Sequence, residues 1–432
     1  MMPLKTPIIL HAWMLATRCL SYPITVVSRR LHNRMGAAPK RFAERLGHKG
    51  LVHEGDVIWF HAASLGEVMQ IGPLADALNR REPRAILVTT TTKAGADWVA
   101  REMPYALHQF VPIDIPSAVN CFLDAWSIAV AVFVEGDIWP RLVMESQKRG
   151  IPQVLLNARH SKTRERFSAI FAVMLARFAL VTCRSERVAD SIRALGVPED
   201  MVHVLPDLRV ASPKLPTSAA LMQPLLLAIG SRPVWLAAST HPDDEDAVLA
   251  AHRHILGQVP NALLIVAPRH PRRGAPLQDM ARALNFDVVR RGLDEELKPD
   301  TQVYIADTLG ELGVFFELSQ VAFVGGSFGK EGGHNPYEPA SFGTAIVSGS
   351  RVKNFADAYQ ALTEAGAAFQ VDGEAELGGV LQDLIQSDRA EKMGKAGLAF
   401  MEAREDCIPT YAKLLTSVSR AVSEKLPLDP ES

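Results

Sequence analysis

The sequence predicts an α/β fold built from two Rossmann-like domains. Apolar strand patterns alternate with amphipathic helix patterns through both halves of the 432-residue chain. Strands separated by helices of this length form βαβ units with a parallel sheet. A weakly patterned segment with several prolines, 211–233, separates the halves. A chain of this length also exceeds what one hydrophobic core usually supports, so we expect two domains.

The elements follow in order from short apolar runs, which predict buried strands, and from longer amphipathic stretches, which predict helices. In the first half we expect strands at 56–63, 85–90, 128–134, 153–157 and 180–183, with helices at 67–79, 93–102, 139–149, 167–178 and 186–195. In the second half we expect strands at 234–238, 262–267, 287–289, 303–305, 321–324 and 345–347, with helices at 244–255, 274–284 and 310–318 and a helix of small residues before 345.

Composition narrows the class of protein. The formal net charge is only −2, which argues against a partner such as a nucleic acid that is bound by bulk charge. The four cysteines are scattered without metal-ligand spacing, which indicates a reducing compartment. Asp244-Glu245-Asp246 has the form DxD, but acidic residues are favoured in the first turn of a helix. We therefore expect neither a metal nor another cofactor.

The segment from Val321 to Gly349 carries the strongest local signal. An apolar strand runs into Gly325-Gly326-Ser327, and a second glycine pair precedes the polar sequence HNPYEP. In open α/β sheets ligands bind where strands end, and glycines there allow the backbone to approach a phosphate. Glu338 is suited to accept hydrogen bonds from a ribose. The pattern favours a nucleotide-sugar site, and a structural turn is the alternative.

This segment resembles the Kdo transferases, which add 3-deoxy-D-manno-octulosonic acid (Kdo) to a lipid A precursor. The family pattern reads approximately GGS…GGHNPLEPA-FG, with leucine where this chain has Tyr337. Further blocks occur in the family's order across residues 40–360, namely WFHAASLGEV, FVEGDIWPRL, LLNARHS, LAASTHPDDED and VAPRH. The resemblance implies a GT-B arrangement, in which two Rossmann-like domains face a cleft.

The resemblance also implies catalytic residues. Glu67, in the GE pair that opens a helix, corresponds to the family's general base, and the helix start favours the ionised form that a base needs. Glu135 corresponds to a glutamate that assists the transition state. Around it the chain departs from the family, since Asp137 replaces a glutamate and leaves the second carboxylate in doubt. Arg209 stands in place of a lysine and keeps the positive charge as a planar fork.

A nucleotide site is implied in the second half. Arg269 is suited to phosphate, and backbone amides at a helix start suit a nucleotide. Ser239 and His241 are expected beside it. The residues that match the family's CMP site are Pro268, Arg269, Gly310, Glu311, Leu312, Asn335, Pro336, Tyr337 and Glu338.

The first 50 residues are basic and partly apolar. The apolar stretch 7–27 is interrupted by Arg18 and Pro23, so it is a poor membrane span, and no convincing signal-peptide cleavage site follows. An amphipathic helix on an anionic leaflet, followed by a basic stretch from Arg29 to Arg45, fits better than an ordinary terminal helix. We expect a membrane-associating segment at 1–50, an acceptor-binding domain at 51–212, a CMP-sugar-binding domain at 213–410, and a C-terminal helix and tail at 411–432.

These expectations combine into one hypothesis. CMP-Kdo is the donor, an anionic lipid A precursor (lipid IVA type) is the acceptor, and the site of action is the cytoplasmic face of the inner membrane. Two alternatives stay open. One is a nucleotide-sugar epimerase of the same two-domain build, and the other is a non-catalytic membrane-bound binding protein.

Overall fold

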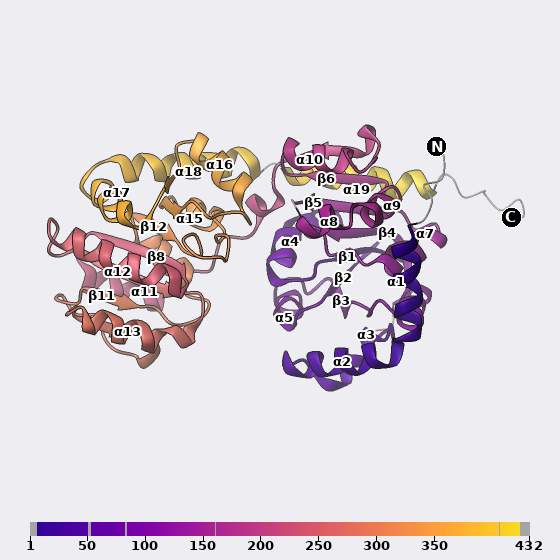
Figure 1. Ribbon diagram of the computed structural model, residues 1–432, viewed down its shortest axis with the longest axis horizontal. Helices are drawn as coiled ribbons and strands as arrows, with labels where there is room; N and C mark the ends of the chain where they lie inside the picture. Colours follow the sequence, from indigo (N-terminus) through magenta and orange to yellow (C-terminus); the bar gives the residue numbers. More distant parts are fainter. Residues whose placement is uncertain (1–6, 51–52, 83, 160, 406, 424–432) are drawn as a thin grey trace, which may run out of the picture. The chain divides into compact units, whose positions relative to one another are not determined.

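The computed structural model describes residues 7–50, 53–82, 84–159, 161–405 and 407–423 (Figure 1). The predicted domain boundary at residue 51 and the end of the predicted tail lie outside these residues. The chain forms two compact units: unit 1 contains Met1–Pro213 with Glu405–Ser432, and unit 2 contains Lys214–Arg404. The predicted α/β fold with two Rossmann-like domains is confirmed.

Unit 1 is built on a parallel seven-stranded sheet in the order β3-β2-β1-β4-β5-β6-β7. The order reverses between β1 and β4, which are hydrogen-bonded neighbours. The strands are β1 (Asp56–His61), β2 (Ala85–Thr90), β3 (Leu107–Phe110), β4 (Ser127–Val134), β5 (Gln153–Ala158), β6 (Leu180–Cys183) and β7 (Val202–Val204). Ligands bind at such a reversal, at the carboxyl ends of the strands.

Helices cover both faces of this sheet, which explains why the strands are apolar almost throughout. Trp59 and Phe133, on neighbouring strands, are fully buried, with their ring centroids 5.4 Å apart. The main helices of unit 1 are α1 (Ile8–Cys19), α2 (Ser21–Arg34), α3 (Phe42–Arg45), α4 (Leu65–Asn79), α5 (Lys93–Glu102), α6 (Pro116–Ala125), α7 (Pro140–Lys148), α8 (Lys162–Arg166), α9 (Ser168–Leu175), α10 (Glu186–Arg193) and α19 (Cys407–Ser423). The C-terminal helix α19 therefore packs in unit 1, although the chain reaches it from unit 2.

Unit 2 repeats the plan with a parallel sheet in the order β10-β11-β9-β8-β12-β13-β14. Here the order reverses between β8 and β12. The strands are β8 (Val234–Thr240), β9 (Leu263–Pro268), β10 (Val288–Arg290), β11 (Val303–Ile305), β12 (Val321–Val324), β13 (Ala345–Gly349) and β14 (Ala368–Val371). The helices are α11 (Ala219–Ile229), α12 (Pro242–Leu256), α13 (Gly274–Ala283), α14 (Leu312–Leu318), α15 (Tyr337–Phe342), α16 (Ala356–Glu364), α17 (Glu374–Gln386) and α18 (Arg389–Glu405).

One expectation about organisation needs correction. The segment 211–233, expected to be weakly patterned, contains the helix α11, which begins after the capping residue Ser218 and ends at Gly230 with a positive φ of 58°. Pro224 lies inside this helix and masked its pattern in the sequence. Leu225 and Ile229 are buried in the core of unit 2, so packing stabilises a helix that contains a proline.

The described part of the N-terminal segment begins with α1 and α2, which belong to unit 1. The indole nitrogen of Trp13 donates to Asp114 at 2.8 Å, and the Arg141 guanidinium donates to Thr17 at 2.8 Å. Asp114 also accepts from the amide of Leu142 at the start of α7. Helix α1 is thus fixed to the domain. Among the described residues, no helix is both long and apolar enough to cross a membrane.

Candidate active site

Glu67 and Glu135 come from the two strands between which the order of unit 1 reverses. Glu67 follows β1 and lies in the first turn of α4, whose N-cap is Ser64. Glu135 is the first residue after β4. The carboxyl ends of these neighbouring strands meet at the place where open α/β sheets bind ligands. The fold therefore brings together the two glutamates that the sequence singles out.

Burial is the largest influence on the protonation of Glu67. Its Oε2 accepts from the Ala63 amide at 2.7 Å, which favours the ionised form. Burial and the nearby Glu135 carboxylate outweigh this bond and raise the pKa of Glu67 to about 7. The sequence points only to the helix start, which favours the ionised form, and not to the burial that opposes it. A pKa near neutrality suits a general base better, because such a group both accepts and releases protons readily.

Glu135 is held in a strained backbone conformation. Its φ is 56°, a region that non-glycine residues rarely occupy. Its side chain accepts from Gln70 Nε2 at 3.2 Å and pairs with Arg159 Nε at 3.0 Å. Strain of this kind persists only where the surroundings fix it, and it gathers at functional sites.

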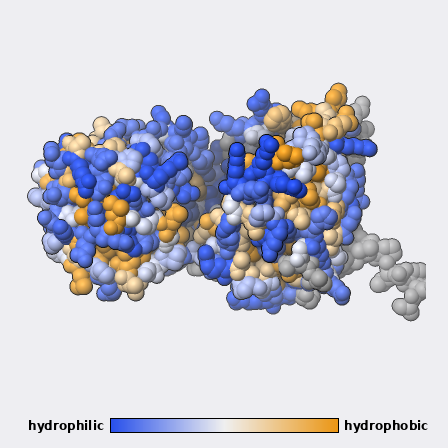
Figure 2. All heavy atoms as spheres, turned by 90° about the horizontal axis from the view of Figure 1, so that it is seen from below, coloured by the Kyte–Doolittle hydropathy of each residue, from blue (hydrophilic) through white to orange (hydrophobic). Residues whose placement is uncertain are grey.

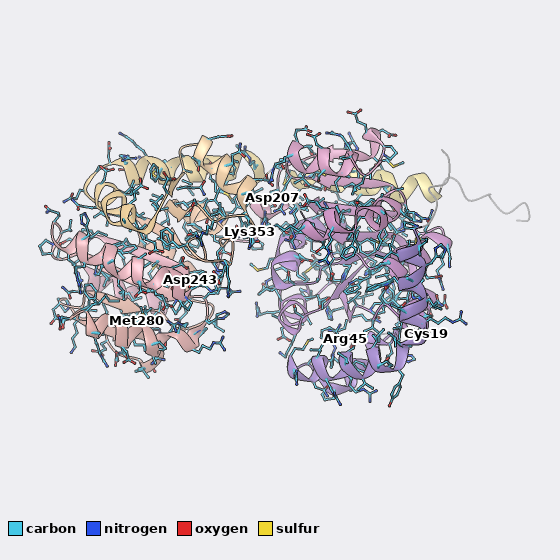
Figure 3. The ribbon with its side chains drawn as sticks, in the orientation of Figure 1. Cys19, Arg45, Asp207, Asp243, Met280 and Lys353 are labelled. Atoms are coloured by element: carbon cyan, nitrogen blue, oxygen red, sulfur yellow. The ribbon has the colours of Figure 1, made fainter. Side chains whose placement is uncertain are left out.

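A buried amide network links Glu135 to Arg209. Asn157, also at positive φ (55°), donates through Nδ2 to Gln70 at 2.6 Å and to Asp207 at 2.9 Å. Asp207 pairs with Arg209, whose Nε lies 3.0 Å from both carboxylate oxygens. Figure 3 labels Asp207 within unit 1. Arg209 is therefore placed in the same hydrogen-bonded cluster as Glu135, with its guanidinium oriented by Asp207.

The second carboxylate of the FVEGDIWPRL block, Asp137, belongs to this cluster. Its Oδ2 lies 3.2 Å from Nε2 of the buried His61, and His61 Nδ1 lies 3.0 Å from the hydroxyl of Thr89. His61 and Asp137 both act on the pKa of Glu67, which His61 lowers and Asp137 raises. The aspartate thus lies close enough to Glu67 to influence its pKa, even though a glutamate is usual at position 137 in the family.

The corresponding edge of unit 2 is organised by Asp244. This carboxylate is fully buried and accepts from the amides of His241 at 2.9 Å, Gly326 at 2.7 Å and Phe328 at 3.2 Å. It therefore ties the loop after β8 to the glycine loop after β12. Ser239, in β8, adopts a positive φ of 55° beside this junction. In the part of unit 2 that is described, the DxD segment thus uses its first carboxylate for backbone amides.

Arg269 and Glu338 lie close enough to affect each other. Burial raises the pKa of Glu338 to about 7, and the hydrogen bond from Asn335 and the charge of Arg269 oppose the shift. Asn335 donates to Glu338 at 3.3 Å and accepts from the Tyr337 amide at 3.1 Å. These residues form one cluster at the carboxyl edge of unit 2. Pro268 ends β9 just before Arg269, and Pro336 caps α15.

The ring of Tyr337 points into unit 2. It is buried and stacks on Phe400 with centroids 6.3 Å apart, so this ring helps to pack α15 against α18. Of the Gly310-Glu311-Leu312 group, Gly310 has a positive φ of 84° and Glu311 pairs with Arg291 at 3.0 Å. The side chain of Glu311 is thus engaged within unit 2, and the backbone of this loop adopts a conformation that favours glycine.

A histidine pair adjoins this cluster. Nε2 of His241 and Nε2 of His334 lie 2.9 Å apart, and the two rings are nearly parallel. Burial and the nearby His241 and Arg269 lower the pKa of His334 to about 4, so at neutral pH it is uncharged. Within the described residues, no group of three or more histidine, cysteine or acidic side chains is arranged to hold a metal ion.

Several residues of these clusters received no role from the sequence. His61 and Asn157 lie in the HAASLGEV and LLNARHS blocks, whose residue pattern gives these two positions no chemical role, and Gln70 lies one turn beyond Glu67. Their role depends on a positive φ and on contacts between distant segments. A positive φ and contacts between distant segments do not appear as residue patterns in the sequence. A polar residue at the end of a buried strand, such as Asn157, can still indicate a site residue.

Comparison with known proteins gives the family of the chain. Residues 30–212 match the family described as 3-deoxy-D-manno-octulosonic-acid transferase (kdotransferase). The chain is 31% identical over 390 residues to the 3-deoxy-D-manno-octulosonic acid transferase of Haemophilus influenzae, covering 87% of this chain and 91% of that protein. It is 32% identical over 388 residues to the probable mitochondrial transferase of the same name from Arabidopsis thaliana, covering 86% of this chain and 87% of the relative.

The chain belongs to the Kdo transferase family. It is therefore an enzyme, a glycosyltransferase. A solved UDP-GlcNAc 2-epimerase from Neisseria meningitidis, bound to UDP-GlcNAc, has a TM-score of 0.61 and covers 85% of this chain and 100% of its own, at 13% identity. That similarity shows the α/β fold of the two Rossmann-like units and says nothing about the reaction. The two alternatives, an epimerase and a non-catalytic binding protein, are not favoured for a Kdo transferase family member.

Proposed function

We propose that the protein transfers Kdo from CMP-Kdo to a lipid A precursor of the lipid IVA type, a step of lipopolysaccharide core biosynthesis. The observation that carries the proposal is the placement of Glu67 beside Glu135 at the strand-order reversal of unit 1, with a pKa of about 7 for Glu67. This is the arrangement that a base acting on a sugar hydroxyl requires.

In the proposed reaction, Glu67 takes the proton of the acceptor hydroxyl as its oxygen attacks the anomeric carbon of Kdo. The bond between that carbon and the phosphate oxygen breaks, and CMP leaves with the bonding electrons. Glu135, fixed by Gln70 and Arg159, offsets the positive charge that develops on the sugar. Arg209 provides a cation for the substrate carboxylate or the phosphate.

Unit 2 is the proposed CMP site. Arg269 pairs with the phosphate, and Glu338 accepts from the ribose hydroxyls. The residues assigned to CMP are Pro268, Arg269, Gly310, Glu311, Leu312, Asn335, Pro336, Tyr337 and Glu338. For Tyr337 the contact is through the backbone, since the ring packs on Phe400. Glu311 contributes through the position of its loop.

The proposed place of action is the cytoplasmic face of the inner membrane, with the N-terminal helices on the lipid surface. Large apolar side chains are exposed on α1 and α2, with Ile8 at 88% and Tyr22 at 81%. Arg29, Arg30 and Arg34 are exposed on α2. Figure 2 shows deep blue and orange side chains next to each other on the face of unit 1 that carries α2. Apolar insertion combined with cationic attraction is how interfacial helices bind anionic lipid.

Two arginines of the predicted basic stretch are not free to contact lipid. Arg45 is buried, and Arg41 pairs with Glu44 at 2.6 Å, so these two are not available to head groups as the sequence suggested. The proposed lipid contact therefore rests on α1, α2 and Lys40.

The test of the proposed function is a product analysis. Purified protein is incubated with CMP-Kdo and a tetraacylated lipid A precursor, and the masses of the lipid products are measured by mass spectrometry. The expected result is an acceptor whose mass has increased by one or more Kdo residues, with CMP released only when the acceptor is present. Release of CMP at the same rate without an acceptor would contradict the proposal.

A further inference from the structure

Arg45 is a buried cation at the junction of the N-terminal segment and the sheet of unit 1. It ends α3 and is 6% exposed. Its Nη2 donates to the carbonyl of Thr91 at 2.6 Å, and its guanidinium lies over the ring of Phe110, 4.7 Å from the centroid. Figure 3 labels Arg45 between α2 and the sheet. Burial lowers the pKa of Arg45 to about 10, which still leaves it charged at neutral pH.

From Thr91 the hydrogen bonds continue to the base. Thr91 directly follows β2, and its amide donates to the carbonyl of Ala63 at 3.0 Å. The amide of Ala63 donates in turn to Oε2 of Glu67 at 2.7 Å. Ala63, which precedes helix α4 and donates to Glu67, is therefore hydrogen-bonded to Thr91, the residue whose carbonyl accepts from Arg45.

On its other side Arg45 holds helix α2. Its Nε donates to Nδ1 of His32, which is fully buried, at 3.2 Å. His32 Nε2 lies 3.0 Å from the carbonyl of Ala38. Because a carbonyl only accepts, Nε2 carries the proton and Nδ1 is left to accept from Arg45. One guanidinium thus joins the helix that carries the basic surface to the loop behind the base.

We propose that Arg45 is a positioning residue for the transfer reaction, which holds the Thr91 carbonyl and through it the Ala63 amide that Glu67 accepts. The proposal rests on the assignment of Glu67 as the base. Arg45 does not touch the reacting atoms. Its effect is to keep one hydrogen bond to Glu67 in place and to make that bond depend on how α2 is seated.

The hydrogen bond from Ala63 opposes the burial that raises the pKa of Glu67. Loosening that bond removes the opposing contribution and moves the pKa of Glu67 further upward. A methionine at position 45 keeps much of the apolar stem and removes every donor. A lysine keeps one cationic donor for the Thr91 carbonyl, but it lacks the planar fork that serves Thr91 and His32 together.

The experiment compares kcat/KM against pH for the parent, Arg45→Met and Arg45→Lys, because this ratio reports the pKa of the free enzyme. A soluble short-chain acceptor removes any need for membrane binding. We expect the acid-side pKa to rise by about half a unit to one unit in Arg45→Met and by less in Arg45→Lys, with kcat/KM at pH 7 reduced about 3- to 10-fold in Arg45→Met. Arg80→Gln, which removes an exposed cation paired with Asp76, is the control and should keep the parent profile.

Each outcome decides the proposal. A lower kcat/KM with an unchanged acid-side pKa in Arg45→Met would show a structural role only and would overturn the proposal. A variant with the same kcat/KM and the same pH profile as the parent would also overturn it. CMP affinity, measured by calorimetry, and thermal unfolding report whether the variant is folded. If Arg45→Met does not fold, Arg45→Lys decides in the same way: a raised acid-side pKa supports the proposal and an unchanged one overturns it. Full turnover in Glu67→Gln would instead overturn the assignment of the base, whatever Arg45 does.

Discussion

At the scale of single residues, opposing influences from its surroundings set the protonation of Glu67, the proposed base. Burial and the Glu135 carboxylate favour the protonated form, and the Ala63 amide favours the ionised form, with a resulting pKa of about 7. A base must be unprotonated, so we expect kcat/KM to rise with pH and to level off above about pH 7. A titration of kcat/KM from pH 5 to pH 9 measures this. An acid limb near pH 4.5, the usual range of a glutamate, would contradict it.

Glu338 permits a second test at this scale. Hydrogen bonds to charged groups contribute about 1.5–3 kcal/mol, so Glu338→Ala should weaken CMP binding by that amount at pH 8. The raised pKa of Glu338, about 7, also predicts how CMP affinity changes with pH. The parent should bind CMP more weakly at pH 6, where the carboxyl is protonated, than at pH 8. The variant should show a smaller pH dependence, because only the phosphate of CMP, with a second pKa of about 6, then titrates in this range.

Calorimetric titration with CMP at the two pH values provides the measurement. Glu391→Ala, at an exposed ion pair on α18, is the matched control and should bind as the parent does. Equal affinity of Glu338→Ala and the parent at pH 8 would remove Glu338 from the ribose site.

At the scale of elements, the loops at the strand ends are held by buried polar side chains. Asp244 accepts three amides from the loops after β8 and β12. Asp244→Asn places an amide group against backbone donors, which should cost about 3 kcal/mol of local stability. Hydrogen exchange of the amides near β8 and β12 should accelerate. Because Asp244 binds backbone amides and not a metal in this account, the effect should be the same with and without added Mg²⁺. The other end of the DxD segment, Asp246, is exposed, and Asp246→Asn should leave exchange unchanged. Equal exchange in both variants would refute this role of Asp244.

Most of the central strands can be predicted from the sequence, because burial on both faces leaves a clear pattern. Strands buried on both faces, such as β4 and β12, read as continuous apolar runs, so their ends and the residues that follow them, Glu135 and Gly325, were located correctly. The elements without a prediction include the short edge strands β3, β7 and β14 and the helices α6, α11, α16, α17 and α18. Edge strands have few apolar residues, and α11 contains a proline and depends on packing in unit 2.

The sequence predicts which residues lie at the candidate site, but it does not predict their pKa values. The order of the blocks locates Glu67, Glu135 and Arg269, but the pKa of Glu67 depends on burial and on a carboxylate 68 positions away, contributed by another strand. Arg45 reads as part of a basic surface because sequence alone cannot tell an exposed arginine from a buried one. Its burial follows from packing on Phe110.

At the scale of the whole molecule, the N-terminal helices should make activity depend on the lipid surface. Replacing Arg29, Arg30 and Arg34 by glutamine removes three exposed cations, each worth about 1 kcal/mol near an anionic leaflet. Co-sedimentation with anionic vesicles should fall at low salt and less so at high salt, where the attraction is screened. Turnover on a vesicle-borne acceptor should fall more than turnover on a soluble one.

A variant with the same loss of charge elsewhere is the control. Arg80, Arg101 and Arg389 are exposed and lie on other elements, so their replacement by glutamine should leave co-sedimentation close to that of the parent. Equal binding of both triple variants at low salt would show that the arginines of α2 only solvate a helix face.

The central claim is that Glu67 is the base of a transfer from CMP-Kdo to a lipid acceptor. The most direct test is acceptor-dependent CMP release by the parent and by Glu67→Gln, with CMP affinity measured alongside. The variant keeps the shape and hydrogen bonding of the side chain but cannot take a proton, so we expect turnover to fall about 100-fold or more with CMP affinity unchanged. Turnover within a fewfold of the parent would contradict the claim.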